Sequence, residues 1–126
     1  MVLVDSSIWI DYFKGVGSSL PLDALIETND LCVNDLILAE LLPSIKIRKE
    51  NRLMRLLESV ERMPMDIDWP QIVSFQIHNL KNGINDVGIP DLMIAQNAIQ
   101  HDLWLFAKDK HFRLMKHHVK LKLFEP

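Results

Sequence analysis

The chain begins with Val2-Leu3-Val4-Asp5-Ser6-Ser7, a pattern typical of a buried strand that turns directly into a helix. A short apolar run rich in β-branched residues favours a strand that is buried on both faces. Because Ser6 and Ser7 are good helix-capping residues, we predict a helix over residues 8–14 that ends at Gly15. Asp5 then lies at the carboxyl end of the first strand.

The same alternation of strand and helix continues to the end of the chain. Further strands are predicted over residues 31–33, 63–65, 103–107 and 119–124, and further helices from residue 21 and over 35–45, 48–60, 68–82, 90–101 and 110–117. This order predicts a three-layer α/β/α sandwich with a mostly parallel central sheet. No repeat or linker divides the chain, so we expect a single domain over residues 1–126. Ligands of such sheets bind at the carboxyl ends of the strands.

Composition narrows the class of protein. Of the 126 residues, 48% are apolar and 25% are charged, which is ordinary for a globular domain. The single cysteine, Cys32, excludes an internal disulfide framework and favours a reducing compartment. No stretch has the form of a signal peptide or the length of a membrane span. We therefore expect a cytoplasmic protein without a membrane partner.

Charge is distributed unevenly along the chain. The net charge of −3 does not indicate a nucleic-acid binder. Up to residue 45, however, Lys14 is the only basic residue, and after Phe106 basic residues greatly outnumber acidic ones. One part of the protein could thus hold cations and another an anionic polymer, although a solvated basic face is the simpler interpretation.

Four acidic residues stand out by their positions. Asp5 and Asp109 follow predicted strands, and Asp91 lies in the first turn of a predicted helix. Each of these three alone could be a turn or capping residue. Glu40 is harder to explain, because no basic residue lies within one helical turn of it and its helix is apolar on nearly all sides. A carboxylate in such surroundings loses hydration unless something compensates it.

A divalent cation would provide that compensation. Carboxylates that converge repel one another, and some take up protons if no cation lies between them. Mg²⁺ or Mn²⁺, which prefer oxygen ligands, remove this penalty. A centre of this kind can activate water and stabilise charge on a phosphate, so it suits phosphodiester hydrolysis.

Four segments of the chain resemble, in order, the motifs of PIN-domain nucleases, especially those of VapC-type toxins. They are VDSSIWIDYF (residues 4–13), LAELL (38–42), GIPDLMIA (88–95) and AKDKHF (107–112). The resemblance implies a sheet of about five parallel strands. It also implies one or two Mg²⁺ or Mn²⁺ ions, held by Asp5, Glu40, Asp91 and Asp109.

The resemblance implies an activity and partners as well. The activity is that of an endoribonuclease, which hydrolyses RNA by metal-activated water and leaves a 5′-phosphate and a 3′-hydroxyl. The partners are a cognate antitoxin protein and a second copy of the chain, in a homodimer that pairs with antitoxins. Such a protein is the toxin of a toxin–antitoxin pair.

Two positions depart from the family pattern. Ala107 and Asn34 stand where the family often has a hydroxyl residue. The missing hydroxyl near Asp109 could weaken a second metal position. We therefore expect Asp5, Glu40 and Asp91 to form the main metal site, with Asp109 supporting that ion or a second one.

Several residues are candidates for contacting the substrate. Ser6 either gives a hydroxyl to metal-bound water or substrate, or simply caps the first helix. Basic residues beside Asp109 could contact RNA phosphates, namely Lys108, Lys110 and Arg113. The five histidines lack the spacing of a zinc site and are interpreted as surface or capping residues.

Two other functions remain open at this stage. A receiver-like signalling domain also has a compact α/β fold and an acidic magnesium pocket, but Ser6 and Ser7 stand where it needs adjacent acids. A non-catalytic PIN-fold binding module would keep the fold without turnover. The retention of all four acidic residues argues against the second alternative.

Overall fold

The sheet of the computed structural model, which describes residues 1–126, has five strands. They are β1 (Val2–Val4), β2 (Leu31–Val33), β3 (Glu61–Arg62), β4 (Trp104–Phe106) and β5 (Lys122–Leu123). The strands lie in the order β3-β2-β1-β4-β5, and every neighbouring pair is parallel. The predicted parallel α/β/α architecture is confirmed, and the sheet is entirely rather than mostly parallel.

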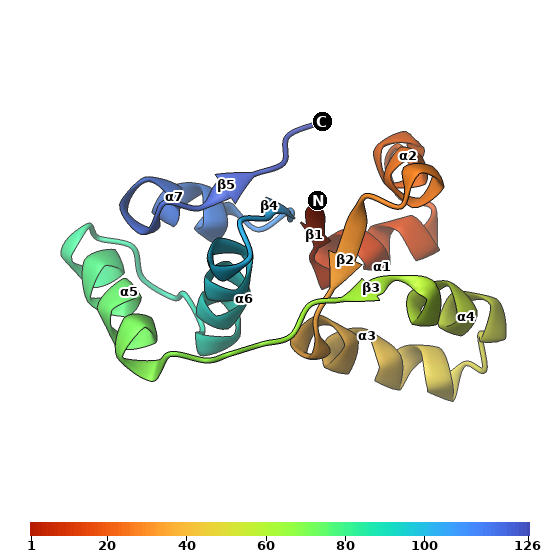
Figure 1. Cartoon of the computed structure of the whole chain (residues 1–126), viewed down its shortest axis with the longest axis horizontal. Coiled ribbons are helices and arrows are strands. Elements are labelled where there is room, and N and C mark those ends of the chain that lie inside the picture. Colours follow the sequence, from red (N-terminus) through yellow and green to blue (C-terminus); the bar gives the residue numbers. More distant parts are fainter.

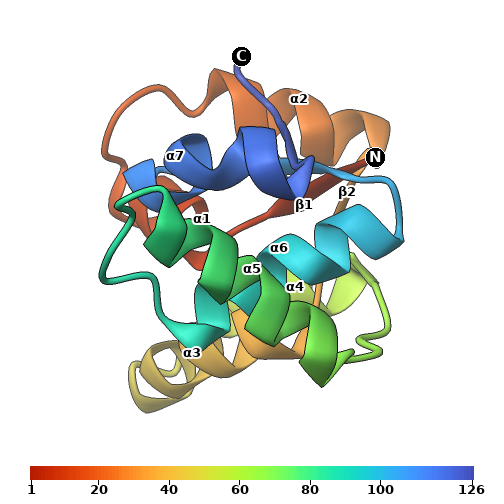
Figure 2. The same cartoon turned by 90° about the vertical axis from the view of Figure 1, so that its left-hand side faces the viewer.

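Helices cover both faces of the sheet (Figures 1 and 2). They are α1 (Ser6–Lys14), α2 (Leu20–Thr28), α3 (Asp35–Ile47), α4 (Asn51–Ser59), α5 (Trp69–Lys81), α6 (Ile89–Gln100) and α7 (Lys110–Val119). Figure 1 shows α5, α6 and α7 on one side of the strands and α1 to α4 on the other. Connections between parallel strands are right-handed. Helices that connect strands added on one side of β1 therefore cover one face of the sheet, and helices that connect strands added on the other side cover the opposite face. None of the helices combines the length and apolar content that crossing a membrane requires.

Several element boundaries differ from the sequence-based prediction. The third strand lies at residues 61–62 rather than 63–65, although the Met63 amide still donates to the Val33 carbonyl over 2.8 Å. Helix α4 begins only at Asn51, because Lys49 adopts a left-handed backbone conformation with φ 55° that interrupts the helix. Helix α7 continues to Val119, which leaves only residues 122–123 for the last strand.

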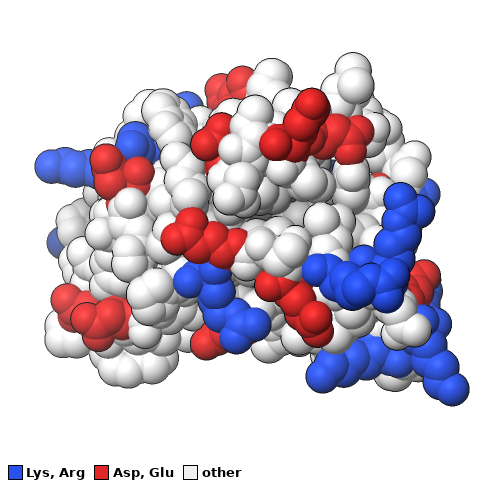
Figure 3. Space-filling view, turned by 45° about the vertical axis from the view of Figure 1, so that its right-hand side comes forward, with Lys and Arg blue, Asp and Glu red and all other residues white.

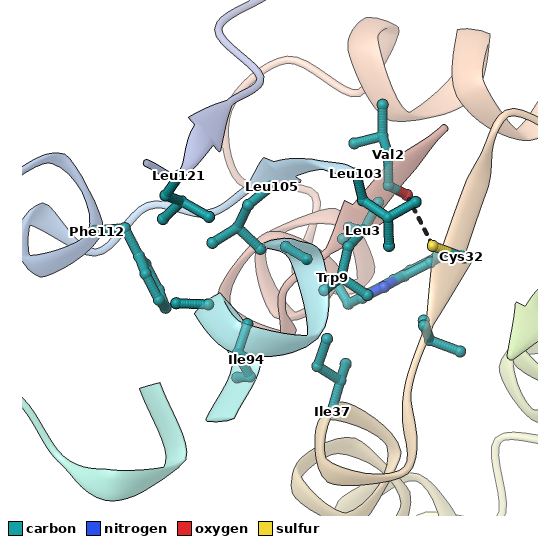
Figure 4. Close-up of a cluster of buried hydrophobic side chains, with 14 of the residues drawn as sticks. Val2, Leu3, Trp9, Cys32, Ile37, Ile94, Leu103, Leu105, Phe112 and Leu121 are labelled. Atoms are coloured by element: carbon teal, nitrogen blue, oxygen red, sulfur yellow. Dashed lines mark hydrogen bonds between the residues drawn. The ribbon is translucent and has the colours of Figure 1, made fainter. Parts of the chain in front are cut away.

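The first residues of the chain build the centre of the core (Figure 4). Leu3, Val4 and Trp9 have no exposed surface, and Leu105 of β4 is equally buried beside them. Cys32 lies in the same cluster, with its Sγ 3.6 Å from the Val2 carbonyl oxygen. Burial raises the pKa of the Cys32 thiol to about 12, so this thiol is a packing group and not a nucleophile.

The strand order determines where a ligand site can form. From β1 the chain moves outward to β2 and β3, and it then returns to place β4 on the other side of β1. In open α/β sheets ligands bind at this reversal point, outside the carboxyl ends of the two strands. Receiver domains have the order 2-1-3-4-5 instead. The order found here excludes the receiver-like alternative.

Candidate metal centre

Two of the four acidic residues singled out in the sequence lie just beyond the carboxyl ends of the neighbouring strands β1 and β4, and the other two lie on helices. Asp5 directly follows β1, and its amide donates to the Phe106 carbonyl at the end of β4 over 2.9 Å. Asp109 lies three residues beyond β4 and caps α7. Asp91 is in the first turn of α6, and Glu40 is in the middle of α3.

The charges of these carboxylates act on one another. The pKa of Glu40 is raised, first by partial burial and then by the negative charges of Asp5 and Asp91. The pKa of Asp91 is also raised, by burial and by the charges of Asp109 and Asp5. Carboxylates from four separate elements therefore influence one another electrostatically. Asp91 and Asp109 also place their oxygens within 4.8 Å of each other, whereas Asp5 and Glu40 do not belong to that tighter group.

Helix ends contribute to the electrostatics of the cluster. Asp5 is the N-cap of α1, Asp109 is the N-cap of α7, and Asp91 lies in the first turn of α6. Each N-terminus carries a partial positive charge and unpaired amide groups. Three such ends partly offset the repulsion among the carboxylates.

Glu40 is more exposed than its apolar helix leads one to expect. Its side chain lies on the outer side of α3 and lines a groove together with Ile10, Leu41 and Ile45. The Ser6 hydroxyl faces Glu40 and opposes the rise in its pKa. Burial is therefore only partial here, and water or a ligand can reach the carboxylate from the groove.

The two serines after Asp5 do not cap the helix as predicted. Helix α1 begins at Ser6, and Asp5 is its N-cap, accepting a bond of 3.2 Å from the Ser7 amide. The Ser7 hydroxyl donates to the same Asp5 oxygen over 2.6 Å. The prediction erred because an aspartate is as good a cap as a serine and comes first in the chain. Ser7 thus fixes the orientation of Asp5, while Ser6 is buried beside Glu40.

His111 joins the cluster although the sequence analysis treated it as a surface or capping residue. One ring nitrogen of His111 and one oxygen each of Asp91 and Asp109 lie within 4.8 Å of one another. The Nδ1 atom is 3.1 Å from Asp109 Oδ1. The one signal in the sequence was the position of His111, two residues after Asp109. A side chain at that position of a helix can lie beside the residue that caps it.

The basic residues beside Asp109 differ in their availability. Lys108 is paired with Asp11, with Nζ 2.7 Å from the carboxylate oxygen. Lys110 and Arg113 are exposed and make no ion pair. In this structure, therefore, only the last two of the three are free to meet a phosphate.

A second basic surface was not predicted from the sequence. It lies where α3 turns into α4, and Figure 3 shows Lys and Arg gathered at that end of the molecule. Its members are all exposed, namely Lys46, Arg48, Lys49, Arg52 and Arg55. Arg48 lines the same groove as Glu40, so this basic turn adjoins the acidic cluster.

Asn34 replaces the hydroxyl that the resemblance leads one to expect after the second strand. It is fully buried, caps α3 by accepting a 2.9 Å bond from the Ile37 amide, and donates to Asn97 Oδ1 over 3.0 Å. Asn97 in turn donates to the Pro64 carbonyl over 2.9 Å. An amide can accept and donate in fixed directions, so Asn34 ties α3 to α6 as well as capping it.

The side chains of the cluster fit a divalent cation. Carboxylate oxygens are hard ligands, and their mutual repulsion, visible in the raised pKa values of Glu40 and Asp91, is what a cation relieves. His111 adds a nitrogen whose Nδ1 is buried and forms no hydrogen bond. Buried polar atoms are rarely left unpaired, so this atom is another that a cation would satisfy.

Comparison with known proteins agrees with the fold. The family profile of the PIN domain matches residues 2–117. Among solved structures, VapBC2 from Rickettsia felis, bound to a DNA fragment from its promoter, aligns with a TM-score of 0.77 and 19% identity, covering 98% of each chain. FitAcB from Neisseria gonorrhoeae aligns with a TM-score of 0.72 and 20% identity, covering 99% of this chain and 97% of that one. A search of curated proteins gave no match. Since the profile spans nearly the whole chain, this protein belongs to the PIN-domain family.

Proposed function

We propose that this protein is a metal-dependent endoribonuclease and the toxin of a toxin–antitoxin pair. The observation that carries the proposal is that Asp5 and Asp109 follow the two strands at the reversal point of the sheet, and that the charges of Asp5, Asp91 and Asp109 help to raise the pKa values of Glu40 and Asp91. Membership of the PIN-domain family supports nuclease activity, because proteins of this family are generally nucleases. We place this activity in the cytoplasm, because the proposed substrate, RNA, is available there.

The roles of the residues follow from their positions. Asp5, Glu40 and Asp91 would hold Mg²⁺ or Mn²⁺, and Asp109 would support that ion or a second one. The bound cation supplies a water of lowered pKa and positive charge for the phosphate oxygens. Ser7 holds Asp5 in place through its hydroxyl, with the hydrogen bond of 2.6 Å. The N-termini of α1, α6 and α7 would stabilise the negative phosphate as it gains charge.

The basic turn between α3 and α4 is the surface we assign to the RNA backbone. Its exposed Lys and Arg side chains make no ion pairs, and Arg48 lines the groove that ends at Glu40. A phosphate chain along this groove would reach the acidic cluster. Lys110 and Arg113, on the other side of the cluster, could hold the chain beyond the cleaved bond. Phosphate contacts of this kind supply affinity without base specificity.

An antitoxin partner is supported by the similarity of the fold to VapBC2 and FitAcB. We assign to it the apolar hollows on either side of α1. One lies between α1 and α3 and contains Ile10 and Leu41, and the other lies among α1, α2 and α4 and contains Leu53 and Leu56. Phe13 lines both, so the two hollows form one apolar surface beside Glu40. A segment bound there would cover the acidic cluster.

A homodimer is supported by the outer face of α5. Four large apolar side chains recur there at helical spacing and remain 46–59% exposed: Trp69, Val73, Ile77 and Leu80. Acidic residues flank the beginning of the helix and basic ones its end. Two copies of α5 packed antiparallel about a twofold axis would cover both stripes and bring Asp66 of each chain towards Lys81 of the other. An isologous interface of this kind is the commonest in homo-oligomers.

The test of the nuclease function is cleavage of single-stranded RNA by the purified protein with Mg²⁺ or Mn²⁺. We expect EDTA to stop cleavage. Asp91→Asn should reduce the rate of cleavage more than about 100-fold, because losing a metal ligand costs more activity than losing a residue that only contacts a ligand. Asp86→Asn is the matched control. Asp86 is an exposed loop residue with φ 66°, a conformation that Asn also tolerates. Cleavage that survives both EDTA and Asp91→Asn would overturn the proposal, and cation binding without any cleavage would instead support the non-catalytic alternative.

A further inference from the structure

His111 is the one nitrogen donor beside the acidic cluster, and nothing in its surroundings uses its Nδ1 atom. Asp109 Oδ1 lies 3.1 Å from Nδ1, but the ring is not aligned for a hydrogen bond to it. That oxygen instead accepts a hydrogen bond of 2.8 Å from the His111 backbone amide. The side chain is 19% exposed, and its Nδ1 is fully shielded from solvent. A buried ring nitrogen without a partner calls for a ligand.

The carboxylates next to His111 indicate which kind of ligand fits. Asp91 and Asp109 each place an oxygen within 4.8 Å of one ring nitrogen of His111 and of one another. Two carboxylates and an imidazole nitrogen at this separation can share one cation. An anion is disfavoured there by the two negative charges.

The backbone holds this arrangement in place. Asp109 is the N-cap of α7, so its carboxylate is tied to the first turn of the helix that carries His111. Phe112, the next residue, is 1% exposed and anchors that turn in the core. The backbone that carries the ring is therefore fixed at the start of α7, and the Asp109 carboxylate is oriented by the cap before any ion arrives.

A nitrogen donor changes which ion such a group prefers. Mg²⁺ strongly prefers oxygen and demands near-ideal octahedral geometry. First-row transition ions accept imidazole readily, and their affinity for mixed nitrogen and oxygen sites rises from Mn²⁺ to Ni²⁺. An oxygen-only site would not discriminate in this way.

We propose that His111, with Asp91 and Asp109, forms a cation position that selects a transition ion such as Mn²⁺ over Mg²⁺. This inference rests on the proposed metal-dependent function, since Asp91 belongs to both positions. It assigns His111 to the metal, whereas Asp5 and Glu40 serve the oxygen-only side of the cluster.

The experiment measures binding of Mn²⁺ alone and of Mg²⁺ alone, without RNA. Free Mn²⁺ is followed by its EPR signal at pH 7.5, and Mg²⁺ is measured by competition with Mn²⁺ and by calorimetry. We expect His111→Asn to weaken Mn²⁺ binding about 10-fold or more and to leave Mg²⁺ binding within about two-fold. His117→Asn, an exposed histidine on the same helix, should change neither.

A second measurement uses the unmodified protein, so it holds even if His111→Asn impairs folding. Pulsed EPR of bound Mn²⁺ should show coupling to an imidazole ¹⁴N nucleus. Absence of this coupling, or equal loss of both ions in a folded His111→Asn variant, would overturn the inference.

The two proposals fail in distinguishable ways. If Asp5→Asn abolishes RNA cleavage while Mn²⁺ shows no nitrogen coupling, the nuclease function stands and the role of His111 falls. If the unmodified protein binds neither ion and cleaves no RNA, both fall.

Discussion

The amide of Asp5 donates a hydrogen bond of 2.9 Å to the carbonyl of Phe106, which ties the end of β1 to the end of β4. This bond is the first contact beyond the register Val4 to Phe106 that the two strands share. It continues the parallel ladder by one step and fixes the backbone from which the Asp5 side chain projects. The catalytic group we assign is thus held by the sheet itself as well as by the helix that it caps.

Asp5 has two roles that different substitutions can separate. Asn keeps the capping oxygen but loses the negative charge, whereas Ala loses both. We expect Asp5→Asn to lower RNA cleavage more than about 100-fold with little change in stability. Asp5→Ala should lower cleavage equally and also reduce the free energy of unfolding by about 1 kcal/mol. Cleavage assays and urea unfolding of both variants check this, and an active Asp5→Asn variant contradicts it.

Glu40 should make the metal-free protein less stable at neutral pH. Its pKa is raised in the folded protein above the ordinary value of 4.5. A raised carboxyl pKa contributes stability that is fully present below the unfolded value and is lost as the pH rises through the folded value. In EDTA, Glu40→Gln should therefore raise the melting temperature at pH 7.5 and lose this advantage towards pH 4.

Added Mn²⁺ should reverse the order of the melting temperatures of the wild type and the Glu40→Gln variant. Ligand binding to the folded state stabilises it in proportion to the logarithm of ligand concentration over Kd. The wild type should gain more than Glu40→Gln, which lacks one carboxylate. Thermal melts at two pH values, with and without Mn²⁺, give all four comparisons. Equal melting temperatures in EDTA at pH 7.5 would show that the repulsion on Glu40 has no energetic consequence.

The basic turn between α3 and α4 can be tested against the basic residues beside Asp109. Neutralising Lys46 and Arg48 together should weaken single-stranded RNA binding and reduce the slope of log affinity against log salt by about 1.4, or about 0.7 per lost phosphate contact. Neutralising Lys110 and Arg113 should have the smaller effect, because they lie outside the groove that contains Glu40. Binding is measured in Ca²⁺ or EDTA to prevent cleavage. The opposite ranking of the two double variants would assign the RNA to the α7 side.

Most of the fold could be predicted from the sequence because each element carries its own local signal. Short apolar runs marked β1 and β2, and prolines or capping residues marked α5 and α6. The short strands β3 and β5 have two residues each, so no periodicity could define them. The end of α7 was also missed, because its stop signal is a left-handed lysine, Lys120 with φ 59°, rather than a glycine.

The residues of the candidate site also differ in how clearly the sequence marks them. The acidic residues stood out because they follow strands, begin helices or lie in an apolar helix. His111 did not, because its role depends on a carboxylate from α6, and contacts between distant segments leave no local trace. The basic turn was missed for a different reason. Its residues lie close together in the sequence, between residues 46 and 55, but only the structure places this run beside the groove that contains Glu40.

Asn34 gives a prediction about stability rather than activity. Asn34→Ala removes the cap of α3 and leaves the Ile37 amide and Asn97 Oδ1 without partners in the interior. We expect a loss of about 2–3 kcal/mol in the free energy of unfolding, since a cap and a buried hydrogen bond are both lost. Asn34→Ser keeps a capping oxygen and should lose about 1 kcal/mol less. Urea unfolding measures the stability of both variants, provided that the dependence of the free energy of unfolding on urea concentration is unchanged. Equal losses in the two variants would mean that the cap contributes nothing.

The outer face of α5 yields the prediction about assembly. Val73 and Ile77 lie at the middle of its apolar stripe, 57% and 46% exposed, so a charge there should prevent two copies from packing. We expect the wild type to be a dimer by sedimentation and Val73→Asp to be a monomer with an unchanged far-UV spectrum. Leu114→Asp is the matched control, because Leu114 is similarly exposed, at 51%, but lies on α7.

Charge exchange tests the antiparallel arrangement of the two helices. If Asp66 of one chain approaches Lys81 of the other, Asp66→Lys should weaken the dimer through repulsion between like charges. Adding Lys81→Asp in the same chain should restore it, because each pair is then reversed. A dimer that survives Val73→Asp would place the interface elsewhere. If Asp66→Lys abolishes the dimer and the added Lys81→Asp does not restore it, the outer face of α5 remains the interface. The antiparallel arrangement of the two helices is then excluded.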